Sequence, residues 1–333
     1  MRISVLEDDV TTIGRFDFAQ TKEGIKILEF NADTPTSIVE VFSVNQSVCD
    51  FFNRINPNKG LAEQLKDAFA KVVNKYKELG YKTDSIVFSS LDWHEEDKGT
   101  TLYLMQQSGL NAKFVALEDL RLYSDNLCYL ENGEYKQIDV WFRLHALEML
   151  AKEKDEDGFE TGAHILNLVA KRKLALINAP SAFIAQTKAM QALIWGLHEE
   201  NEFFTQEEHE TIEKYMLPTY MDNKFEGKCN YVTKPFYGRE GGAVSLYASN
   251  GEIIAKDEEE YYWDQPCIYQ RMVELEELQA ETINGPYKGR SLWESFLIGG
   301  KASGIGLRVG DLITGNLSFF LPICVEDNKG NVR

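Results

Sequence analysis

A β-hairpin that decides the fold of this chain is predicted by two stretches, Arg15-Phe-Asp-Phe18 and Ile25-Lys-Ile-Leu-Glu-Phe-Asn31. Both alternate between apolar and polar residues, the pattern of a β-strand. The connection Thr21-Lys-Glu-Gly24 ends in glycine, which suits a left-handed position in a short turn. The two strands are therefore expected to pair in an antiparallel arrangement.

The register of this hairpin determines which side chains share a face. If the turn centres on Glu23, Asp17 lies opposite Glu29, and Arg15 lies opposite Asn31. These polar residues then lie on one face of the hairpin. The opposite face is apolar and is expected to face the core; it carries Phe16, Phe18, Leu28 and Phe30.

The polar face has the composition of a magnesium site. Asp17, Glu29 and Asn31 supply oxygen ligands, which Mg²⁺ prefers, and Arg15 could hold a phosphoryl group beside the ion. The alternative is an ordinary solvated face. The following stretch, Ala32-Asp-Thr-Pro-Thr-Ser37, favours the functional interpretation because it places hydroxyl groups and a turn beside the polar residues.

The next part of the chain predicts a βαβ unit. Strands are expected at Ser85–Phe88 and Ala112–Leu117, with a helix at Thr100–Gln107 between them. Glu118 and Asp119 follow the second strand directly, at the end where open α/β sheets bind ligands. Longer helices are predicted at Leu61–Leu79, Trp141–Lys152 and Ile184–Leu197.

The last third of the chain predicts antiparallel strands around a glycine-rich loop. Tyr231–Pro235 is expected to be a strand that runs into Gly238-Arg-Glu-Gly-Gly242. Backbone N–H groups of such a loop can approach phosphate oxygens closely, although a plain hairpin loop explains it equally well. Further strands are expected at Val244–Tyr247, Glu252–Ala255, Cys267–Val273, Trp293–Ile298 and Ala302–Arg308. Asn250-Gly251 and Gly299-Gly300 are expected to be hairpin turns that pair the strands on either side of them.

Composition excludes several classes of protein. The 333 residues carry a formal charge of −18, which disfavours nucleic acid as a partner. The longest apolar runs are too short for a membrane span. Five scattered cysteines, none in a C-x-x-C pair, indicate neither a disulfide framework nor a zinc site, so a cytoplasmic location is expected.

Four segments resemble the signatures of the glutathionylspermidine synthase family, and most closely its stand-alone acid–amine ligases without an amidase domain. They occur in the family's order and span almost the whole chain. The segments are Arg15-Phe-Asp17, Leu28-Glu-Phe-Asn-Ala-Asp-Thr-Pro-Thr-Ser37, Thr233-Lys-Pro-Phe-Tyr-Gly-Arg-Glu-Gly241 and Gly304-Ile-Gly-Leu-Arg308.

The resemblance implies an α/β (α+β) protein with the ATP-grasp fold and a Rossmann-like pre-ATP-grasp lobe. It implies a metal-binding hairpin in residues 1–50, a βαβ substrate lobe in 51–165 and a nucleotide-binding part in 166–333. Only fourteen residues precede Arg15, fewer than is usual in the family, so we expect an N-terminally shortened chain: a fragment, a chain that starts late, or a naturally shortened relative. The implied activity joins a carboxylic acid to an amine through an acyl phosphate, with ATP converted to ADP and phosphate.

The resemblance also implies a role for individual residues. Arg15 and Arg308 act on the transferring phosphoryl group, and Asp17, Glu29 and Asn31 hold two Mg²⁺ ions. The residues implied to contact ATP are Arg15, Phe16, Asp17, Lys188, Lys234, Glu240, Gly241 and Gln270, and those implied to contact substrate are Thr34, Glu118 and Asp119.

The implied substrates are a small-molecule or peptide carboxylate and an amine, with glutathione and a polyamine as one candidate pair. Without the resemblance, Lys188 would be interpreted as an ordinary surface lysine and Arg308 as a salt-bridge partner. A different class of function is a non-catalytic Mg-ATP-binding module, or a shortened relative that has lost activity. The sequence does not indicate the oligomeric state.

Overall fold

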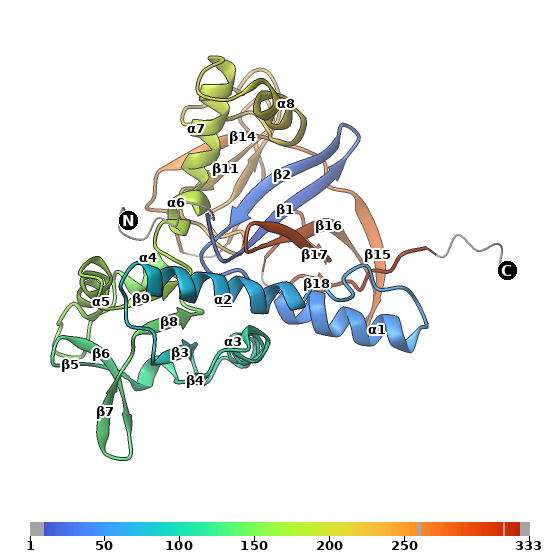
Figure 1. Cartoon of the computed structure of the whole chain (residues 1–333). Coiled ribbons are helices and arrows are strands. Elements are labelled where there is room, and N and C mark those ends of the chain that lie inside the picture. Colours follow the sequence, from blue (N-terminus) through green and yellow to red (C-terminus); the bar gives the residue numbers. More distant parts are fainter. Residues whose placement is uncertain (1–9, 259–260, 316, 327–333) are drawn as a thin grey trace.

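The computed structural model of the chain describes residues 10–258, 261–315 and 317–326 (Figure 1). Within these residues the strands form six-, five-, four- and three-stranded sheets, so the chain is a mixed α/β protein. No helix in these ranges is long and apolar enough to span a bilayer.

The six-stranded sheet joins the two ends of the described chain. Strands β1 (Ile13–Thr21) and β2 (Gly24–Asn31) form its N-terminal hairpin. The order β18-β17-β16-β1-β2 is antiparallel, with β15 also paired to β16. The C-terminal strands are β15 (Glu277–Thr282), β16 (Gly285–Ile298), β17 (Lys301–Gly310) and β18 (Phe319–Phe320). The predicted pairing of the last two long strands around Gly299-Gly300 is confirmed as β16–β17.

The predicted pairs of the first hairpin are confirmed, because Arg15 pairs with Asn31 and Asp17 with Glu29. The turn is not centred on Glu23 as expected, since Thr21 pairs with Gly24, and a β-bulge between Asp17 and Phe18 shifts the register to the predicted pairs. The prediction for its faces is wrong. Arg15 and Asp17 are buried, at 6% and 1% exposure, whereas the four apolar residues opposite are only half-buried: Phe16, Phe18, Leu28 and Phe30. The reason is that β16 and β17 extend the sheet beyond β1, so that Glu294 lies beside Arg15 and Arg308 beside Asp17. Phe16 stacks on Phe30 instead, at 4.1 Å between ring centroids.

The five-stranded antiparallel sheet has the order β10-β14-β11-β12-β13. The expected strands of this region are confirmed, with the tight turn at Asn250-Gly251 between β12 and β13. The strands are β10 (Thr219–Tyr220), β11 (Tyr231–Pro235), β12 (Ser245–Tyr247), β13 (Ile253–Lys256) and β14 (Cys267–Arg271).

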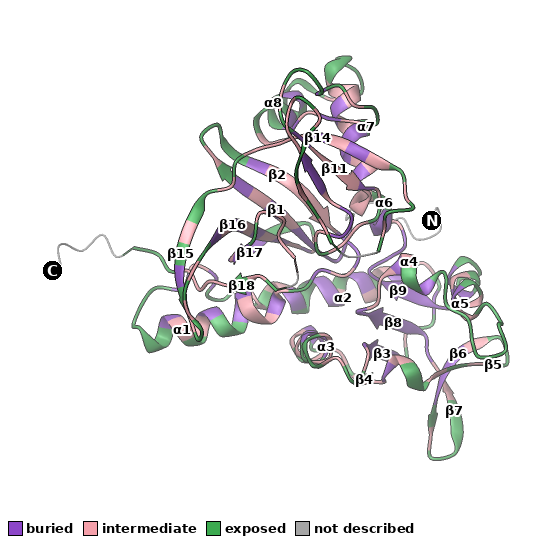
Figure 2. Ribbon diagram, turned by 180° about the vertical axis from the view of Figure 1, so that it is seen from behind, coloured by how far each residue is buried: buried purple, intermediate pink, exposed green. Residues whose placement is uncertain are grey.

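The four-stranded sheet is parallel, with the order β4-β3-β8-β9. The predicted βαβ unit is confirmed as β3 (Ile86–Ser89), α3 (Glu95–Ser108) and β4 (Ala112–Phe114). The helix predicted over Trp141–Lys152 is wrong for its first part, and within this range only Leu147–Leu150 is an α-helix. Val140–Arg143 is strand β8, paired on both sides and buried throughout, as is β9 (Ala175–Ile177) (Figure 2). An apolar run that is buried on both faces lacks the alternation that distinguishes a strand from a helix.

Helix α2 (Glu63–Glu78) fulfils the prediction for Leu61–Leu79 and lies between the six-stranded and the parallel sheet (Figure 1). Its apolar face joins both sheets in one core, which includes Phe69, Phe88, Phe142 and Phe296. A second core lies on the other side of the parallel sheet, around Trp141, Leu168 and Leu176. The hairpin is thus attached to the parallel sheet through shared packing.

The helix predicted over Ile184–Leu197 is two helices, α6 (Ala182–Gln186) and α7 (Lys188–Glu199). Thr187 between them is extended, and its hydroxyl accepts a hydrogen bond from the N–H of Ala189. This N-cap makes Lys188 the first residue of α7. The remaining helices are α1 (Asn45–Phe51), α4 (Leu147–Leu150), α5 (Thr161–Ala170) and α8 (Gln206–Tyr215), with a π-helical turn at Glu40–Val44 before α1.

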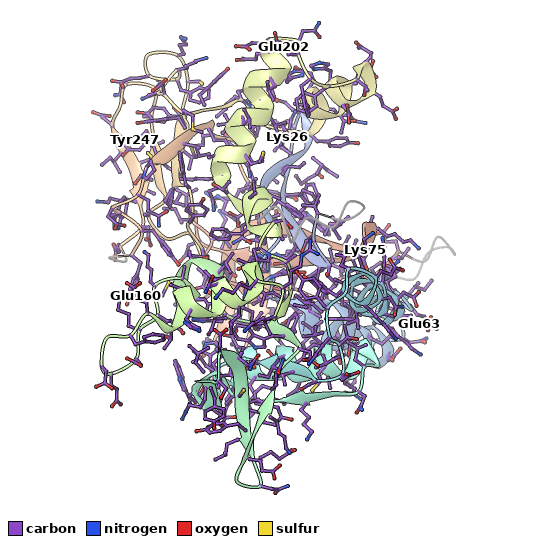
Figure 3. The ribbon with its side chains drawn as sticks, turned by 60° about the vertical axis from the view of Figure 1, so that its left-hand side comes forward. Lys26, Glu63, Lys75, Glu160, Glu202 and Tyr247 are labelled. Carbon is purple, nitrogen blue, oxygen red and sulfur yellow. The ribbon has the colours of Figure 1, made fainter. Side chains whose placement is uncertain are left out.

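Two features were not anticipated from the sequence. A three-stranded meander follows a 3-10 turn at Leu117–Asp119 and extends from the parallel sheet; its strands are β5 (Leu120–Tyr123), β6 (Asn126–Glu131) and β7 (Glu134–Gln137). Helix α8 ends against β2, where the ammonium of Lys26 (labelled in Figure 3) donates to the carbonyls of Glu213 at 3.2 Å and Lys214 at 2.8 Å. A cation at a helix C-terminus is favourable.

Candidate functional site

Three carboxylates form a row across the six-stranded sheet. Asp17 on β1 pairs with Glu29 on β2 and, on its other side, with Glu294 on β16. Asp17 and Glu294 are each only 1% exposed. Carboxylates buried this closely need cations nearby, because both desolvation and their mutual repulsion oppose ionisation.

Two arginines supply that charge at the Asp17 end of the row. The guanidinium of Arg15 donates to both Asp17 oxygens, at 2.7 Å and 2.9 Å. Arg308 on β17 donates to Asp17 Oδ2 at 3.0 Å, and its Nε lies 2.5 Å from Glu294 Oε1. Burial raises the pKa of Asp17, and both guanidinium groups oppose that rise. Arg15 and Arg308, predicted as a catalytic pair, are therefore held on one carboxylate.

Two lysines lie at the Glu29 end. The ammonium of Lys188 lies 3.2 Å from Glu29 Oε2 and donates to the Gly238 carbonyl at 2.8 Å. Lys234 on β11 donates to the Leu28 carbonyl at 3.0 Å. Burial raises the pKa of Glu29, but Lys188, Lys234 and Arg15 outweigh it and hold that pKa well below the usual range.

The pKa of Lys234 is shifted in the opposite direction. Burial lowers it to about 8; Glu29 opposes this shift and the positive charge of Lys188 adds to it. With this pKa, Lys234 is still mainly protonated near pH 7 and loses its charge as the pH rises through about 8. Four cationic side chains face three carboxylates here, so the cluster has one positive charge in excess, which suits a polyphosphate.

A cavity of about 130 Å³ opens beside this cluster, between the six-stranded and five-stranded sheets. Asp17, Glu29, Lys234 and Gln270 line it, together with apolar side chains that include Leu28, Val232, Leu246, Met272 and Leu292. Gln270 is buried, and its amide donates to Gln191 at 3.0 Å and to Thr219 at 3.1 Å. The cavity is smaller than usual small-molecule pockets of roughly 300–1,000 Å³, so a nucleotide requires it to widen.

The glycine-rich loop forms one wall of the cavity. Gly241 has φ +76°, and a Cβ added there would lie 2.8 Å from Ile313 Cγ2 and 3.1 Å from the Thr314 carbonyl oxygen. Glycine is therefore required both by the backbone conformation and by the close approach of the 311–315 segment. Glu240 precedes it, also with positive φ.

Arg239 connects this loop to the opposite side of the site. Its guanidinium lies 2.7 Å from Glu148 Oε1 on α4, donates to Thr34 Oγ1 at 2.7 Å, and lies 3.4 Å from Asp33 Oδ2. Asp33 is itself held by Arg143 at 2.6 Å. The loop is thus fastened to the segment that follows β2 and to the parallel-sheet lobe.

The other predicted residues are placed as follows. Asn31 extends its amide nitrogen toward Asp17 Oδ2 at 3.5 Å and Glu29 Oε1 at 3.4 Å, which brings the three predicted metal ligands together. Glu118 and Asp119 lie in the 3-10 turn after β4, where Glu118 accepts from the N–H of Asp92 at 3.2 Å. No contact between described residues connects that turn to the carboxylate row.

Sequence reasoning missed several residues of this site. Glu294 was not predicted, nor was the pairing of Arg143 with Asp33, and both Asp33 and Arg239 were noted only as parts of longer segments. Glu294 lies within an apolar stretch, Ser291-Leu-Trp-Glu-Ser-Phe296. An acidic residue in such a stretch was the available signal, but its position beside Asp17 depends on a pairing between distant strands.

The donor set fits Mg²⁺ bound together with phosphates. No group of three or more His, Cys, Asp and Glu side chains arranged to hold a metal occurs among residues 10–258, 261–315 and 317–326. Mg²⁺ is usually held by one or two carboxylates with water and substrate phosphates, so two carboxylates and an amide are sufficient. In this structure arginine and lysine side chains balance the charges of the two carboxylates. Bound phosphates would interact with the same cationic side chains.

Comparisons with known proteins agree with these observations. A family model described as glutathionylspermidine synthase preATP-grasp matches residues 1–326. A Haemophilus influenzae protein named "Putative acid--amine ligase" is 27% identical over 320 residues, which cover 93% of this chain and 73% of that protein.

More distant matches are the bifunctional glutathionylspermidine synthetase/amidases of Escherichia coli K12 and Shigella flexneri. Each is 21% identical over 304 residues, which cover 84% of this chain and 46% of the relative. The chain therefore spans about half the length of these two relatives. Since the family model covers nearly its whole length, the chain belongs to the glutathionylspermidine synthase family.

Proposed function

We propose that this protein is an ATP-dependent carboxylate–amine ligase with an ATP-grasp fold. The observation that carries the proposal is the convergence of four cationic side chains on two carboxylates that line a cavity. Arg15 and Arg308 contact Asp17, Lys188 contacts Glu29, and Lys234 lines the cavity beside both carboxylates. Such a set matches the needs of phosphoryl transfer, in which cations neutralise charge that develops on the moving phosphoryl group.

The proposed reaction has two steps. A carboxylate oxygen attacks the γ-phosphorus of ATP, the bond to ADP breaks, and an acyl phosphate forms. The neutral amine then attacks the acyl carbon, phosphate leaves, and a proton is released from nitrogen. Two Mg²⁺ ions would be held by Asp17, Glu29 and Asn31 and would neutralise phosphate charge.

Residues of the chain have separate tasks in this proposal. Lys188 and Lys234 hold the phosphates, Phe16 and Gln270 border the nucleotide, and Arg15 and Arg308 face the transferred group. Closure of the loop around Glu240 and Gly241 would exclude water, which would otherwise hydrolyse the acyl phosphate. Thr34, Glu118 and Asp119 are proposed as contacts to the acid or the amine.

The proposed division of labour follows the chain: a metal-binding hairpin in residues 1–50, a substrate lobe in 51–165 and a nucleotide-binding part in 166–333. The relatives' names support a peptide carboxylate and a polyamine as the first substrates to examine. A cytoplasmic location is part of the same proposal.

The experiment is ADP release by the purified chain with Mg-ATP and a panel of acids and amines that includes glutathione and spermidine. Release that requires both an acid and an amine supports the ligase. Tight Mg-ATP binding without release under every pair would favour the non-catalytic module. The matched variant Asp17→Asn should greatly weaken Mg²⁺-dependent ATP binding, and an unchanged affinity would contradict the metal assignment.

A further inference from the structure

Glu294 has no role in the proposed reaction, although it lies at the centre of the site. It occupies the middle of β16, between Asp17 on β1 and Gly306 on β17. Its side chain is fully buried, with 0% exposure. An ionisable side chain buried to this degree needs a reason, because its desolvation is costly.

The contacts of Glu294 converge on the two arginines of the site. Its Oε1 lies 2.5 Å from Arg308 Nε and 3.6 Å from Arg15 Nη1, and it accepts a hydrogen bond from the Ser37 hydroxyl at 3.2 Å. Arg308 thereby bridges Glu294 and Asp17, and Arg15 lies beside both carboxylates. The two guanidinium groups share the same two acidic partners.

The rest of the Glu294 environment is poorly suited to stability alone. Its Oε2 is buried without a hydrogen-bond partner among the described residues. Space for this oxygen depends on Gly306, since a Cβ there would lie 3.1 Å from Oε2 and 2.6 Å from Val41 Cγ2. Unsatisfied buried polar atoms are rare and concentrate where function opposes stability.

The two carboxylates differ in what a metal ion would do to them. Asp17 faces the cavity beside Glu29, so a bound cation would take oxygens that now accept from Arg15 and Arg308. Glu294 is absent from the cavity lining and would keep its contacts. Glu294 is therefore the carboxylate that can keep its contacts with both guanidinium groups when the Asp17 oxygens bind a metal ion.

We propose that Glu294 is a positioning residue that holds Arg15 and Arg308 against the transferring phosphoryl group. The inference rests on the proposed function, because it assumes that both arginines act on that group. The inference goes beyond the proposed function because it assigns Glu294 to one stage of the reaction, the transfer of the phosphoryl group. Ground-state nucleotide binding depends mainly on the lysines, whereas the transition state depends on correctly placed guanidinium groups.

The test compares two ligands of the full chain, Mg-ADP and Mg-ADP with aluminium fluoride, which mimics the phosphoryl group in transfer. In Glu294→Gln, which removes only the charge, we expect Mg-ADP affinity within about threefold of the unmodified chain and affinity for the aluminium fluoride complex at least about tenfold lower. Where turnover is measurable, kcat should fall by about 10- to 100-fold with little change in KM for ATP.

Two further variants make the result decisive. Asp139→Asn, which removes a buried carboxylate that caps the N–H groups of Asp84 and Ser85, controls for general destabilisation and should leave the ratio of the two affinities unchanged. Glu294→Asp keeps the charge but withdraws it from the arginines, so an intermediate loss is expected even if Glu294→Gln does not fold.

The possible outcomes distinguish a failure of this inference from a failure of the proposed function. If the unmodified chain binds Mg-ADP but Glu294→Gln and Glu294→Asp bind the aluminium fluoride complex as tightly as it does, the positioning role is wrong. If the unmodified chain binds neither ligand, the proposed function itself fails. An equal loss of affinity for both ligands in Glu294→Gln would make the residue merely structural and would also overturn the proposal.

Discussion

Asp17 and Glu294 lie directly opposite each other on neighbouring strands, and Arg308 contacts both. Like charges in such a cross-strand position destabilise a sheet unless cations lie between them. The strand that carries Asp17 and the strand that carries Glu294 come from opposite ends of the chain. The charged cluster is therefore assembled only when the N-terminal hairpin docks onto the C-terminal strands.

Binding of Mg-ATP should weaken as the pH rises above about 8. Burial lowers the pKa of Lys234 to about 8, so its ammonium is lost across this range, and phosphates bind the charged form. Each pH unit above the pKa should lower the affinity by up to about tenfold, with a proton taken up on binding. Isothermal titration in buffers of different ionisation enthalpy measures both effects.

The matched control is Lys234→Arg. A guanidinium stays charged throughout this range, so the variant should bind Mg-ATP with no step near pH 8. If the variant and the unmodified chain show the same pH dependence, Lys234 is not its source. The same shift affects stability: between about pH 8 and the ordinary lysine pKa, the unfolded chain binds more protons, so this group's contribution to the free energy of unfolding rises with pH.

Replacing Asn178 by alanine should destabilise the protein strongly. Its side-chain oxygen accepts from the N–H groups of Thr12 and Ile13 at 3.0 Å and 3.1 Å, and its nitrogen donates to the carbonyls of Ile13 and Asp33 at 2.9 Å and 2.8 Å. The variant leaves these buried groups unpaired, at a cost of about 3 kcal/mol or more in the free energy of unfolding.

Urea denaturation measures this cost. Asn126→Ala is the control, because among the described residues that side chain donates to the exposed turn carbonyl of Ser124 alone, and its loss should stay within about 0.5 kcal/mol. A loss below about 1 kcal/mol in Asn178→Ala would contradict the idea that this asparagine fastens the hairpin to β9.

Alanine at Gly14 should also destabilise the sheet. A Cβ there would lie 2.7 Å from the Phe30 ring and 2.8 Å from Thr11 Cγ2, so the stacked Phe16–Phe30 pair must move. Such overpacking typically costs about 1–3 kcal/mol. Gly99→Ala in α3 meets no atom within 4 Å and should be neutral or stabilising. Equal denaturation midpoints for the two variants would refute the steric argument.

The pairing of the hairpin strands could be predicted because it depends on local information. The turn at Thr21–Gly24 and the alternation on both sides make the two strands antiparallel neighbours, while a β-bulge between Asp17 and Phe18 brings Asp17 opposite Glu29. The tight turns at Asn250-Gly251 and Gly299-Gly300 likewise determine which strands pair. The β-bulges that shift the register along these hairpins were not predicted.

The predictions failed where contacts between distant parts of the chain determine the structure. Val140–Arg143 has no alternating pattern, because helices and sheets cover both of its faces. The polar face of β1 was expected to be the exposed one, but Glu294 of β16 and Arg308 of β17 lie beside Arg15 and Asp17, which are buried. Glu294 could not be placed beside Asp17 for the same reason: nothing local indicates which strand will pair along the free side of β1.

Releasing Arg239 should loosen the glycine-rich loop. This side chain alone connects the loop to Glu148 and Thr34 in the described contacts, so Arg239→Ala should speed hydrogen exchange of the 238–242 amides by about tenfold or more. Arg121→Ala, which alters an exposed arginine on β5, is the control and should leave these amides unchanged. Peptide-resolved exchange mass spectrometry distinguishes the two. If the loop amides exchange equally in Arg239→Ala and the unmodified chain, the loop is held by its glycine geometry and by packing against Ile313, and the arginine is not its fastening.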